Sequence, residues 1–446
     1  MITPHRCAVN EFLPSEMLFQ LLSGVNLPRA SLDGEALPNA RELSLALSEM
    51  NSQSRREKME FSQFLVHWAQ FVYDDMVQLG SYSGLNGAPL ACCGAASNHT
   101  ECFPIPINET DPVFLGHVTC FSYTRSALAP KEDCELGPRE QMNLATSFLD
   151  GSVIYGSTKA TAADLKDIDN GGQLRSNTIP NQKELLPHAE SGVPCLRSAN
   201  EPCFKSGGPN VNLLSTTAVL STLWLRQHNS IASSLQDLNP HWDSEKIYLQ
   251  ARRIVSAQIQ HITFSEYLPL VIGQRQVQDM GLSLSRSHFY TDYDLNLSPN
   301  SLNEFASVAG LFFLVLVPPE IVGLDSDGSR VEQTPLRDAW LRPGSLHFRD
   351  RLDALTRFLL SEGIRDLDGE ENGFPTEIRD SFLRPDPGSL GLDLIALIIH
   401  RGRDHGIPGY GKWREFCGLR PLRRWSDVAG ELRDGNFTEI LASLYQ

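Results

Sequence analysis

The sequence lacks an apolar run long enough to span a membrane. Its longest run, VAGLFFLVLV, covers residues 308–317 and ends at Pro318 and Pro319, whereas a spanning helix needs about 20 apolar residues. We therefore predict no membrane span. We expect the run to form part of a buried helix over residues 299–317, which opens with Ser301 and Glu304 in capping-box spacing and stops at the two prolines.

Positive charge is also scarce. The 446 residues include 38 Lys and Arg against 54 Asp and Glu, a formal net charge of -16. Proteins that bind nucleic acids or anionic membranes need basic surfaces to replace counterions, so the overall balance argues against both and favours cationic partners or divalent metal ions. Flexible linkers, internal repeats and low-complexity tracts are missing as well, which favours one compact unit.

Cysteine, by contrast, is plentiful. Five of the nine cysteines crowd a segment rich in Gly, Pro and Asn, where disulfides rather than a core would hold the loops: Cys92, Cys93, Cys102, Cys120 and Cys134. Their pairing stays open. Zinc is the competing interpretation, but paired CxxC elements are missing.

Glycosylation sequons agree with an oxidising compartment. They occur at Asn98, Asn108 and Asn436 and predict a secreted glycoprotein, although the N-terminus MITPHRCAVNEF has no apolar core of the signal-peptide kind.

Helical periodicity dominates the rest of the chain. Apolar residues recur at helical spacing in residues 61–80, 214–235 and 239–270, and strand patterns are few, so we predict a mainly α fold. One of these helices has an acidic residue on its apolar stripe. In residues 61–80 the position after Val72 on the stripe is Asp75, where an unpaired buried charge would be costly.

A row of oxygen-bearing groups further along the chain offers Asp75 a partner. In MNLATSFLDGSVIYGS, Thr146, Phe148, Asp150 and Ser152 alternate, and alternate residues of an extended backbone point to one side. Hydroxyls, a carboxylate and carbonyls suit a hard cation such as calcium, with Asp75 as a further carboxylate. Ordinary turns also use Thr, Ser and Asp, so spacing alone leaves both interpretations open.

Four segments, in order, resemble blocks of the animal haem peroxidases, the family of myeloperoxidase, thyroid peroxidase and peroxidasin: FLDGSVIYGS, TLWLRQHNSIA, LNEFASVAG and RGRDHGIPGYGKWREFCGL. The resemblance runs from about Leu37 to about Trp425. It implies a mainly α, peroxidase-like single domain over residues 37–446, truncated at its C-terminus, after an incomplete N-terminal segment 1–36. It also implies that calcium is held beside the haem position by Asp75, Thr146, the Phe148 carbonyl, Asp150 and Ser152.

The same resemblance implies that the haem chemistry is missing. A haem peroxidase needs a distal histidine and an arginine to cleave peroxide, and a proximal histidine, oriented by an asparagine, to ligate iron. The matching residues here are Asp74, Asn210, Leu314 and Ile398, and the two ester-forming acids correspond to Tyr73 and Leu213. We therefore expect no haem and a former haem cleft partly filled by side chains.

The resemblance also bears on the remaining histidines and cysteines. His228 and His405 match structural histidines of the family, while His67 and His400 leave open a haem held by atypical ligands. Cys195 and Cys203 match a local disulfide. Cys417 resembles a cysteine whose partner lies further downstream, and we expect an upstream partner for Cys7. We therefore expect the sequence to be a fragment.

Two functional classes follow. The first is a secreted, catalytically inactive peroxidase-like protein that serves as a matrix, adhesion or interaction component, in a calcium-rich or calcified setting that its acidic composition would suit. The alternative is a peroxide-dependent oxidoreductase with atypical haem ligands. A third possibility is the peroxidase-like part of a larger oxidase.

Overall fold

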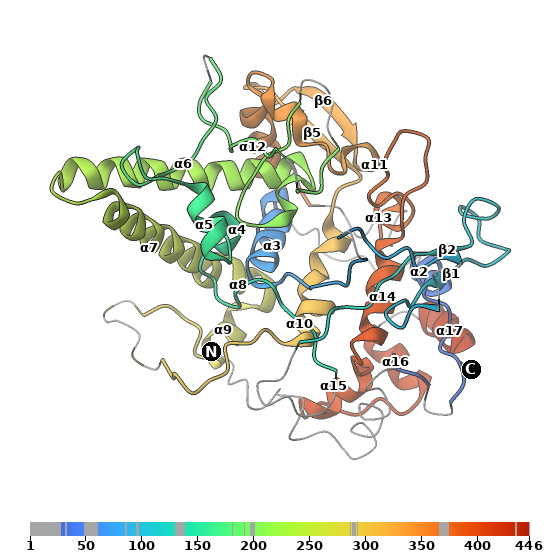
Figure 1. Ribbon diagram of the computed structural model, residues 1–446. Coiled ribbons are helices and arrows are strands. Elements are labelled where there is room, and N and C mark those ends of the chain that lie inside the picture. Colours follow the sequence, from blue (N-terminus) through green and yellow to red (C-terminus); the bar gives the residue numbers. More distant parts are fainter. Residues whose placement is uncertain are drawn as a thin grey trace.

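The computed structural model describes residues 28–445, apart from 32–33, 49–60, 85–86, 95–97, 130–138, 181, 191, 197–200, 286, 288–290, 292, 365–373 and 433–434. Helices make up most of the ordered structure (Figure 1), and they surround a core in a single domain. The expected mainly α fold is confirmed. Among the described residues, no helix is both long enough and apolar enough to cross a membrane.

The helices of the first half of the chain are α2 (Ala40–Ser48), α3 (Gln63–Met76), α4 (Ser152–Tyr155), α5 (Lys159–Leu165), η3 (Pro209–Asn212) and α6 (Ser215–Leu238). They are followed by α7 (Ser244–Ile262), the π-helical turn η4 (Thr263–Tyr267), α8 (Leu268–Ile272), α9 (Gln274–Asp279), α10 (Asn303–Ser307) and η5 (Ala309–Leu316). The C-terminal part contains α11 (Leu336–Ala339), η6 (Pro343–His347), α12 (Arg351–Ser361), α13 (Thr376–Arg379), α14 (Leu394–Asp404), α15 (Tyr410–Phe416), α16 (Trp425–Leu432) and α17 (Gly435–Leu444).

Strands are short, and only β5 contributes several buried residues to the main core among the described residues. The described ones form three antiparallel pairs: β1 (Ile105–Pro106) with β2 (Cys120–Phe121), β3 (Lys166–Asp167) with β4 (Gln173–Leu174), and β5 (Glu320–Leu324) with β6 (Arg330–Pro335). In the longest pair Ile321 faces Thr334, and the register shifts at Gly323 and Leu324.

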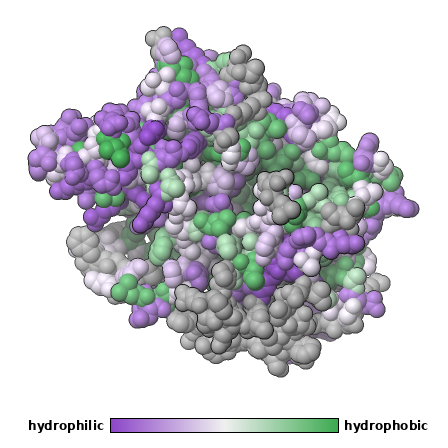
Figure 2. Space-filling view, viewed as in Figure 1, coloured by the Kyte–Doolittle hydropathy of each residue, from purple (hydrophilic) through white to green (hydrophobic). Residues whose placement is uncertain are grey.

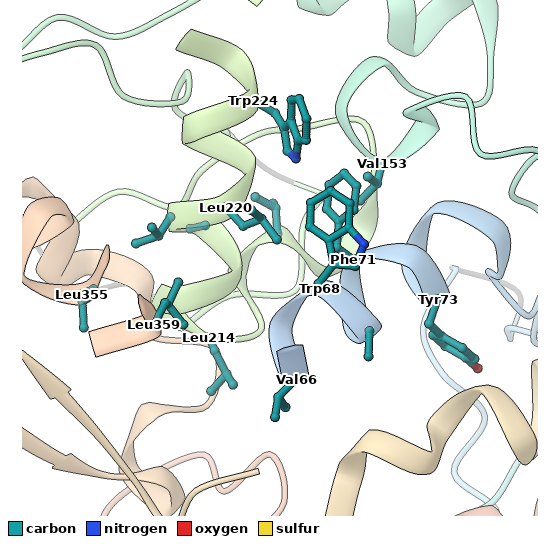
Figure 3. Packing of buried hydrophobic residues seen from close by; sticks show 14 of the residues in the cluster. Val66, Trp68, Phe71, Tyr73, Val153, Leu214, Leu220, Trp224, Leu355 and Leu359 are labelled. Atoms are coloured by element: carbon teal, nitrogen blue, oxygen red, sulfur yellow. The ribbon is translucent and has the colours of Figure 1, made fainter. Parts of the chain in front are cut away.

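The main core forms where α3, α6 and α12 meet. Figure 3 shows aromatic side chains of α3 and α6 packed together, with Leu355 and Leu359 of α12 close by. The ring centroids of Trp68 and Phe71 lie 5.4 Å apart, and those of Trp68 and Trp224 lie 6.1 Å apart. Such aromatic contacts add to the free energy gained by removing apolar surface from water.

Three of the predicted helices appear in the structure. Residues 61–80 contain α3, residues 214–235 lie almost entirely within α6, and residues 239–270 contain α7, which continues through the turn η4 into α8. The apolar periodicity therefore identified the helices on which the core is built.

The single helix predicted over residues 299–317 is wrong. The chain forms the short helix α10, breaks at Val308, and continues as the 3-10 helix η5. Ser301 does not cap α10: its hydroxyl donates to the Met76 carbonyl of α3 at 3.2 Å, and the N-cap is Leu302. The apolar run shows no helical periodicity that would have revealed this break.

A buried arginine connects the N-terminal helix to the C-terminal half. Arg41 of α2 is 1% exposed, and its guanidinium contacts three carboxylates: Asp111 at 2.8 Å, Asp380 at 2.8 Å and Asp393 at 2.7 Å. Asp393 is also the N-cap of α14, because its side chain accepts from the Ala396 N–H. Arg41 thus contacts three carboxylates from different segments of the chain, of which Asp380 also pairs with Arg379.

We predict that Arg41→Met lowers the free energy of unfolding by about 3–5 kcal/mol, because it leaves buried carboxylates without their cation. Urea unfolding would measure this, with Arg275→Met as the matched control. The Arg275 side chain is 89% exposed and lies 3.5 Å from Asp279, so the control should change stability by less than about 0.5 kcal/mol. Equal effects of the two variants would contradict the role of Arg41.

Candidate functional site

Asp75 lies at the end of α3 and is fully buried. Its carboxylate accepts hydrogen bonds from the backbone N–H groups of Gly151 at 3.1 Å and Val153 at 3.0 Å, and from the Ser152 hydroxyl at 3.2 Å. Free N–H groups at a helix start need such acceptors, so Asp75 caps the helix α4. This contact joins α3 to the loop before α4.

The loop before α4 brings together the other oxygen-bearing residues of the sequence hypothesis. Asp150 accepts hydrogen bonds from the Thr146 hydroxyl at 2.9 Å and from the Ser152 N–H at 3.0 Å. The Phe148 side chain is exposed, while its carbonyl accepts from the Asp150 N–H at 2.9 Å. Arg252 of α7 approaches Asp150 to 3.6 Å.

These five residues form an oxygen-rich cluster that fits a hard cation in its chemistry. Hydrogen bonds link Thr146 to Asp150 and Ser152 to Asp75, so their oxygens are within reach of one another. Burial raises the pKa of Asp75 to about 6, and the nearby charge of Asp150 adds to that rise, while hydrogen bonds from Val153 and Gly151 oppose it. A cation would relieve this cost.

The cluster contains only two carboxylates. Accordingly, among the described residues no group of three or more His, Cys, Asp or Glu side chains is placed to hold a metal ion. A calcium ion here would depend on hydroxyl and carbonyl oxygens as well as on Asp75 and Asp150.

Asp74 and Asn210 lie in contact, although 136 positions separate them in the sequence. The Asn210 amide of η3 donates to Asp74 Oδ1 at 2.9 Å, and the second carboxylate oxygen is buried without a partner among the described residues. Burial raises the pKa of Asp74 to about 7, although the hydrogen bonds from Asn210 and Gln70 act in the opposite direction and lower it. The pair offers neither an imidazole nor a guanidinium.

Tyr73 spans the space between α3 and the segment α10–η5. Its hydroxyl donates to the Ala306 carbonyl at 2.6 Å, and its ring centroid lies 6.2 Å from that of Phe305 and 6.5 Å from that of Phe313. Figure 3 shows the Tyr73 ring pointing away from Trp68 and Phe71. A Cβ added at Gly310 would lie 2.8 Å from the Tyr73 ring, so only glycine permits this approach.

Three further positions of the sequence hypothesis are apolar and belong to the same core. Leu314 of η5 is buried in the main hydrophobic cluster, and Leu213 and Ile398 pack against that cluster. A haem held by groups on α3 and on η5 would have to lie between these two helices. In the structure the Tyr73 side chain contacts Ala306 and Gly310, so it lies between α3 and the segment α10–η5.

The four histidines considered above are buried, and each forms a hydrogen bond. His67 contacts the Gln63 carbonyl at 3.0 Å and the Thr216 hydroxyl at 2.7 Å. His400 contacts the Phe103 carbonyl at 2.8 Å. The other two do the same: His228 contacts Tyr155 and Gly172, and His405 contacts Ser126 and Asn303. Burial lowers the pKa of each histidine to about 4.

Disulfides are present, as the cysteine pattern predicts. They join Cys92 to Cys102, Cys93 to Cys120 and Cys195 to Cys203. Cys417 is an exposed free thiol, while Cys134 and Cys7 lie outside the described residues. Of the sequon residues, Asn98 and Asn108 are exposed, and Asn436 lies in α17.

The chain belongs to the animal haem peroxidase family, because the model of that family matches residues 14–446. Among its relatives, peroxidasin of Drosophila melanogaster is 32% identical over 92% of this chain and 27% of its own length. Thyroid peroxidase of Sus scrofa is 30% identical over 94% of this chain and 47% of its own length. The chain therefore spans less than half the length of these relatives.

Solved structures agree with this assignment. Peroxidase A from Dictyostelium discoideum superimposes with a TM-score of 0.75 at 26% identity, over 94% of this chain and 78% of its own. A fatty acid alpha-dioxygenase from Arabidopsis thaliana, with a TM-score of 0.65 at 19% identity, shares the fold.

The sequence hypothesis missed two features of the site. It assigned Asp75 to calcium alone and overlooked that its carboxylate caps α4, which Gly151 and Ser152 before an apolar run could have suggested. It also overlooked Gly310, whose missing side chain admits the Tyr73 ring; nothing in the local sequence indicates that contact.

We predict that His67 makes the protein less stable in acid. A neutral buried histidine with a folded-state pKa of about 4, against about 6.5 when unfolded, contributes fully above pH 6.5 and loses its contribution as the pH falls towards 4. The loss amounts to about 3 kcal/mol at most. His67→Gln should therefore lessen the fall in unfolding free energy between pH 6.5 and 4, while His228, His400 and His405 still contribute to it.

The matched control is His241→Gln, at an exposed position. Urea unfolding at several pH values should give the wild-type slope for this control. A wild-type slope in His67→Gln as well would show that the imidazole is protonated in the folded protein.

Proposed function

We propose that this protein is a secreted, catalytically inactive member of its family that acts as an extracellular matrix, adhesion or interaction component. The three disulfides and the exposed sequon residues Asn98 and Asn108 support an oxidising, extracellular setting. The acidic composition suits a calcium-rich or calcified matrix.

One observation carries the proposed loss of activity: Asp74 and Asn210 contact each other where peroxide cleavage requires a histidine and an arginine. A carboxylate with an amide partner cannot pass a proton to a leaving oxygen and stabilise its charge as an imidazole and a guanidinium do. On the opposite side, Leu314 offers iron no ligand. Tyr73, packed on Gly310, removes part of the space that a porphyrin needs.

We further propose that calcium binds the cluster of Asp75, Thr146, Asp150, Ser152 and the Phe148 carbonyl. Its role is structural, because the cluster joins α3 to the loop before α4. When bound, the ion would neutralise the mutual repulsion of Asp75 and Asp150. Haem, when bound, supplies redox chemistry at its iron. The residues at the matching positions of this chain do not fit haem.

The alternative function is a peroxide-dependent oxidoreductase with atypical haem ligands. It would need His67 or His400 to reach iron, yet His67 uses both ring nitrogens in hydrogen bonds. His400 keeps its Nδ1 buried without a partner among the described residues, and its ring stacks on Phe103 at 3.7 Å between centroids. His400 is thus the more suitable of the two.

We predict that haemin added to the purified protein gives no stoichiometric Soret band, and that peroxide turnover stays at the level of free haemin. Absorption titration would measure both, with a catalytically active haem peroxidase as the positive control. A tightly bound haem with peroxide-dependent oxidation would refute the proposed function. Loss of that band in His400→Gln, but not in the control His241→Gln, would then establish the alternative.

We predict that calcium raises the melting temperature. At a hundredfold excess over its Kd, a ligand of the folded state adds about 2.7 kcal/mol, which corresponds to about 3 °C for a chain of this length. Differential scanning calorimetry with calcium or with chelator would measure the shift. Asp150→Ala should abolish the response, whereas Asp74→Asn should retain it, because Asp74 bonds Asn210 rather than the loop. An equal melting temperature of the wild type with calcium and with chelator would contradict the proposed calcium site.

A further inference from the structure

A basic corner stands out on this acidic protein. Helix α15, the turn over residues 417–424 and the start of α16 contain four exposed cations, which we call the basic corner: Lys412, Arg420, Arg423 and Arg424. In Figure 1, α15 and α16 lie beside the lower end of α14. The chain as a whole has a net charge of -16, so this local excess of positive charge runs against its composition.

The charged groups of the corner face solvent. The side chains of Arg420 and Arg424 are 80% and 77% exposed, and that of Lys412 is 53% exposed. Three of these cations lie within ion-pair distance of a carboxylate: Asp427 is 3.6 Å from Arg420 and 3.9 Å from Arg424, and Glu415 is 3.5 Å from Lys412. Exposed pairs at such distances contribute little, so these guanidinium groups keep most of their hydrogen-bonding capacity for a ligand.

The turn that presents these arginines is held in place by other contacts. Asp427 accepts hydrogen bonds from the backbone N–H groups of Arg423 at 3.2 Å and Arg424 at 3.1 Å. The buried Arg414 donates to the Arg420 carbonyl at 3.1 Å and to Glu431 of α16 at 3.0 Å. The backbone is thus preorganised, which lowers the entropic cost of binding.

The chemistry of the corner suits sulfate groups. A guanidinium presents a planar fork of N–H donors that matches the oxygens of tetrahedral anions. The acidic surfaces elsewhere on the chain would repel such anions. Arg420, Arg423 and Arg424 lie within the five consecutive residues RPLRR. Such a density of basic residues is typical of heparin-binding or nucleic-acid-binding patches.

We propose that the basic corner binds a sulfated glycosaminoglycan. The disulfides favour an extracellular polyanion over a nucleic acid, and four cations on an otherwise acidic protein suit a short sulfated stretch rather than a wide anionic membrane. The choice of polyanion takes the extracellular setting from the proposed function. Binding itself does not depend on whether haem is absent.

Heparin is the probe for the test, with affinity measured on immobilised heparin at several salt concentrations. The wild type should bind at 50 mM salt with a slope of log affinity against log salt of about -3, from four cations at about 0.7–0.9 each. The triple variant Arg420→Gln, Arg423→Gln, Arg424→Gln should bind at least tenfold more weakly, with a slope near -1. Substitution by Gln leaves the backbone N–H groups of residues 423 and 424 in place, so their hydrogen bonds to Asp427 should persist.

The matched control removes three exposed arginines from other surfaces: Arg253→Gln, Arg275→Gln, Arg349→Gln. It makes the same change in net charge and should retain the wild-type affinity. Three results would overturn the proposal: no wild-type binding at 50 mM salt, equal losses in the two triple variants, or equal binding of desulfated heparin. Duplex DNA of equal length binding as tightly as heparin would also overturn it, in favour of a nucleic-acid site.

The outcome is separable from that of the haemin titration. A protein that binds heparin through the basic corner and also holds haem would refute the proposed loss of activity and leave this inference intact.

Discussion

The contact between Tyr73 and Gly310 joins α3 to η5 at the centre of this fold. It brings the aromatic ring of α3 against the backbone of η5, and the hydroxyl of the same tyrosine bonds the Ala306 carbonyl at 2.6 Å. Close-packed interiors keep few voids, since each lost contact costs dispersion energy. Leu213, Leu314 and Ile398 pack into the same core, so contacts between side chains hold these helices together.

Neighbouring carboxylates at the end of α3 have different environments. Asp75 receives hydrogen bonds from backbone groups of the loop before α4 and faces Asp150. Asp74 points to Asn210 and leaves one oxygen unpartnered among the described residues. The first arrangement supports the proposed calcium site and the second the proposed loss of peroxide chemistry. One helix would thus keep its structural function after losing its catalytic one.

The parts of this account that could be predicted from the sequence rest on periodicity and on motif order. Apolar spacing located α3, α6 and α7, and the ordered sequence blocks identified the family. The same blocks predicted that Asp74 and Asn210 stand at the positions of the distal histidine and the arginine, and these two residues are in contact in the structure. Spacing failed where tertiary contacts decide, as at Val308, where a uniformly apolar run breaks into α10 and η5. The network around Arg41 was equally hidden, because its carboxylates come from distant segments.

The central claim is that side chains of the protein occupy the space between α3 and η5. An experimental structure of crystals grown with an excess of haemin tests it most directly. Our account predicts that the Tyr73 ring lies on Gly310, with its hydroxyl bonded to the Ala306 carbonyl, and that no porphyrin lies between the two helices. Electron density for a porphyrin in that space, with Tyr73 displaced and a side chain bound to iron, would contradict it.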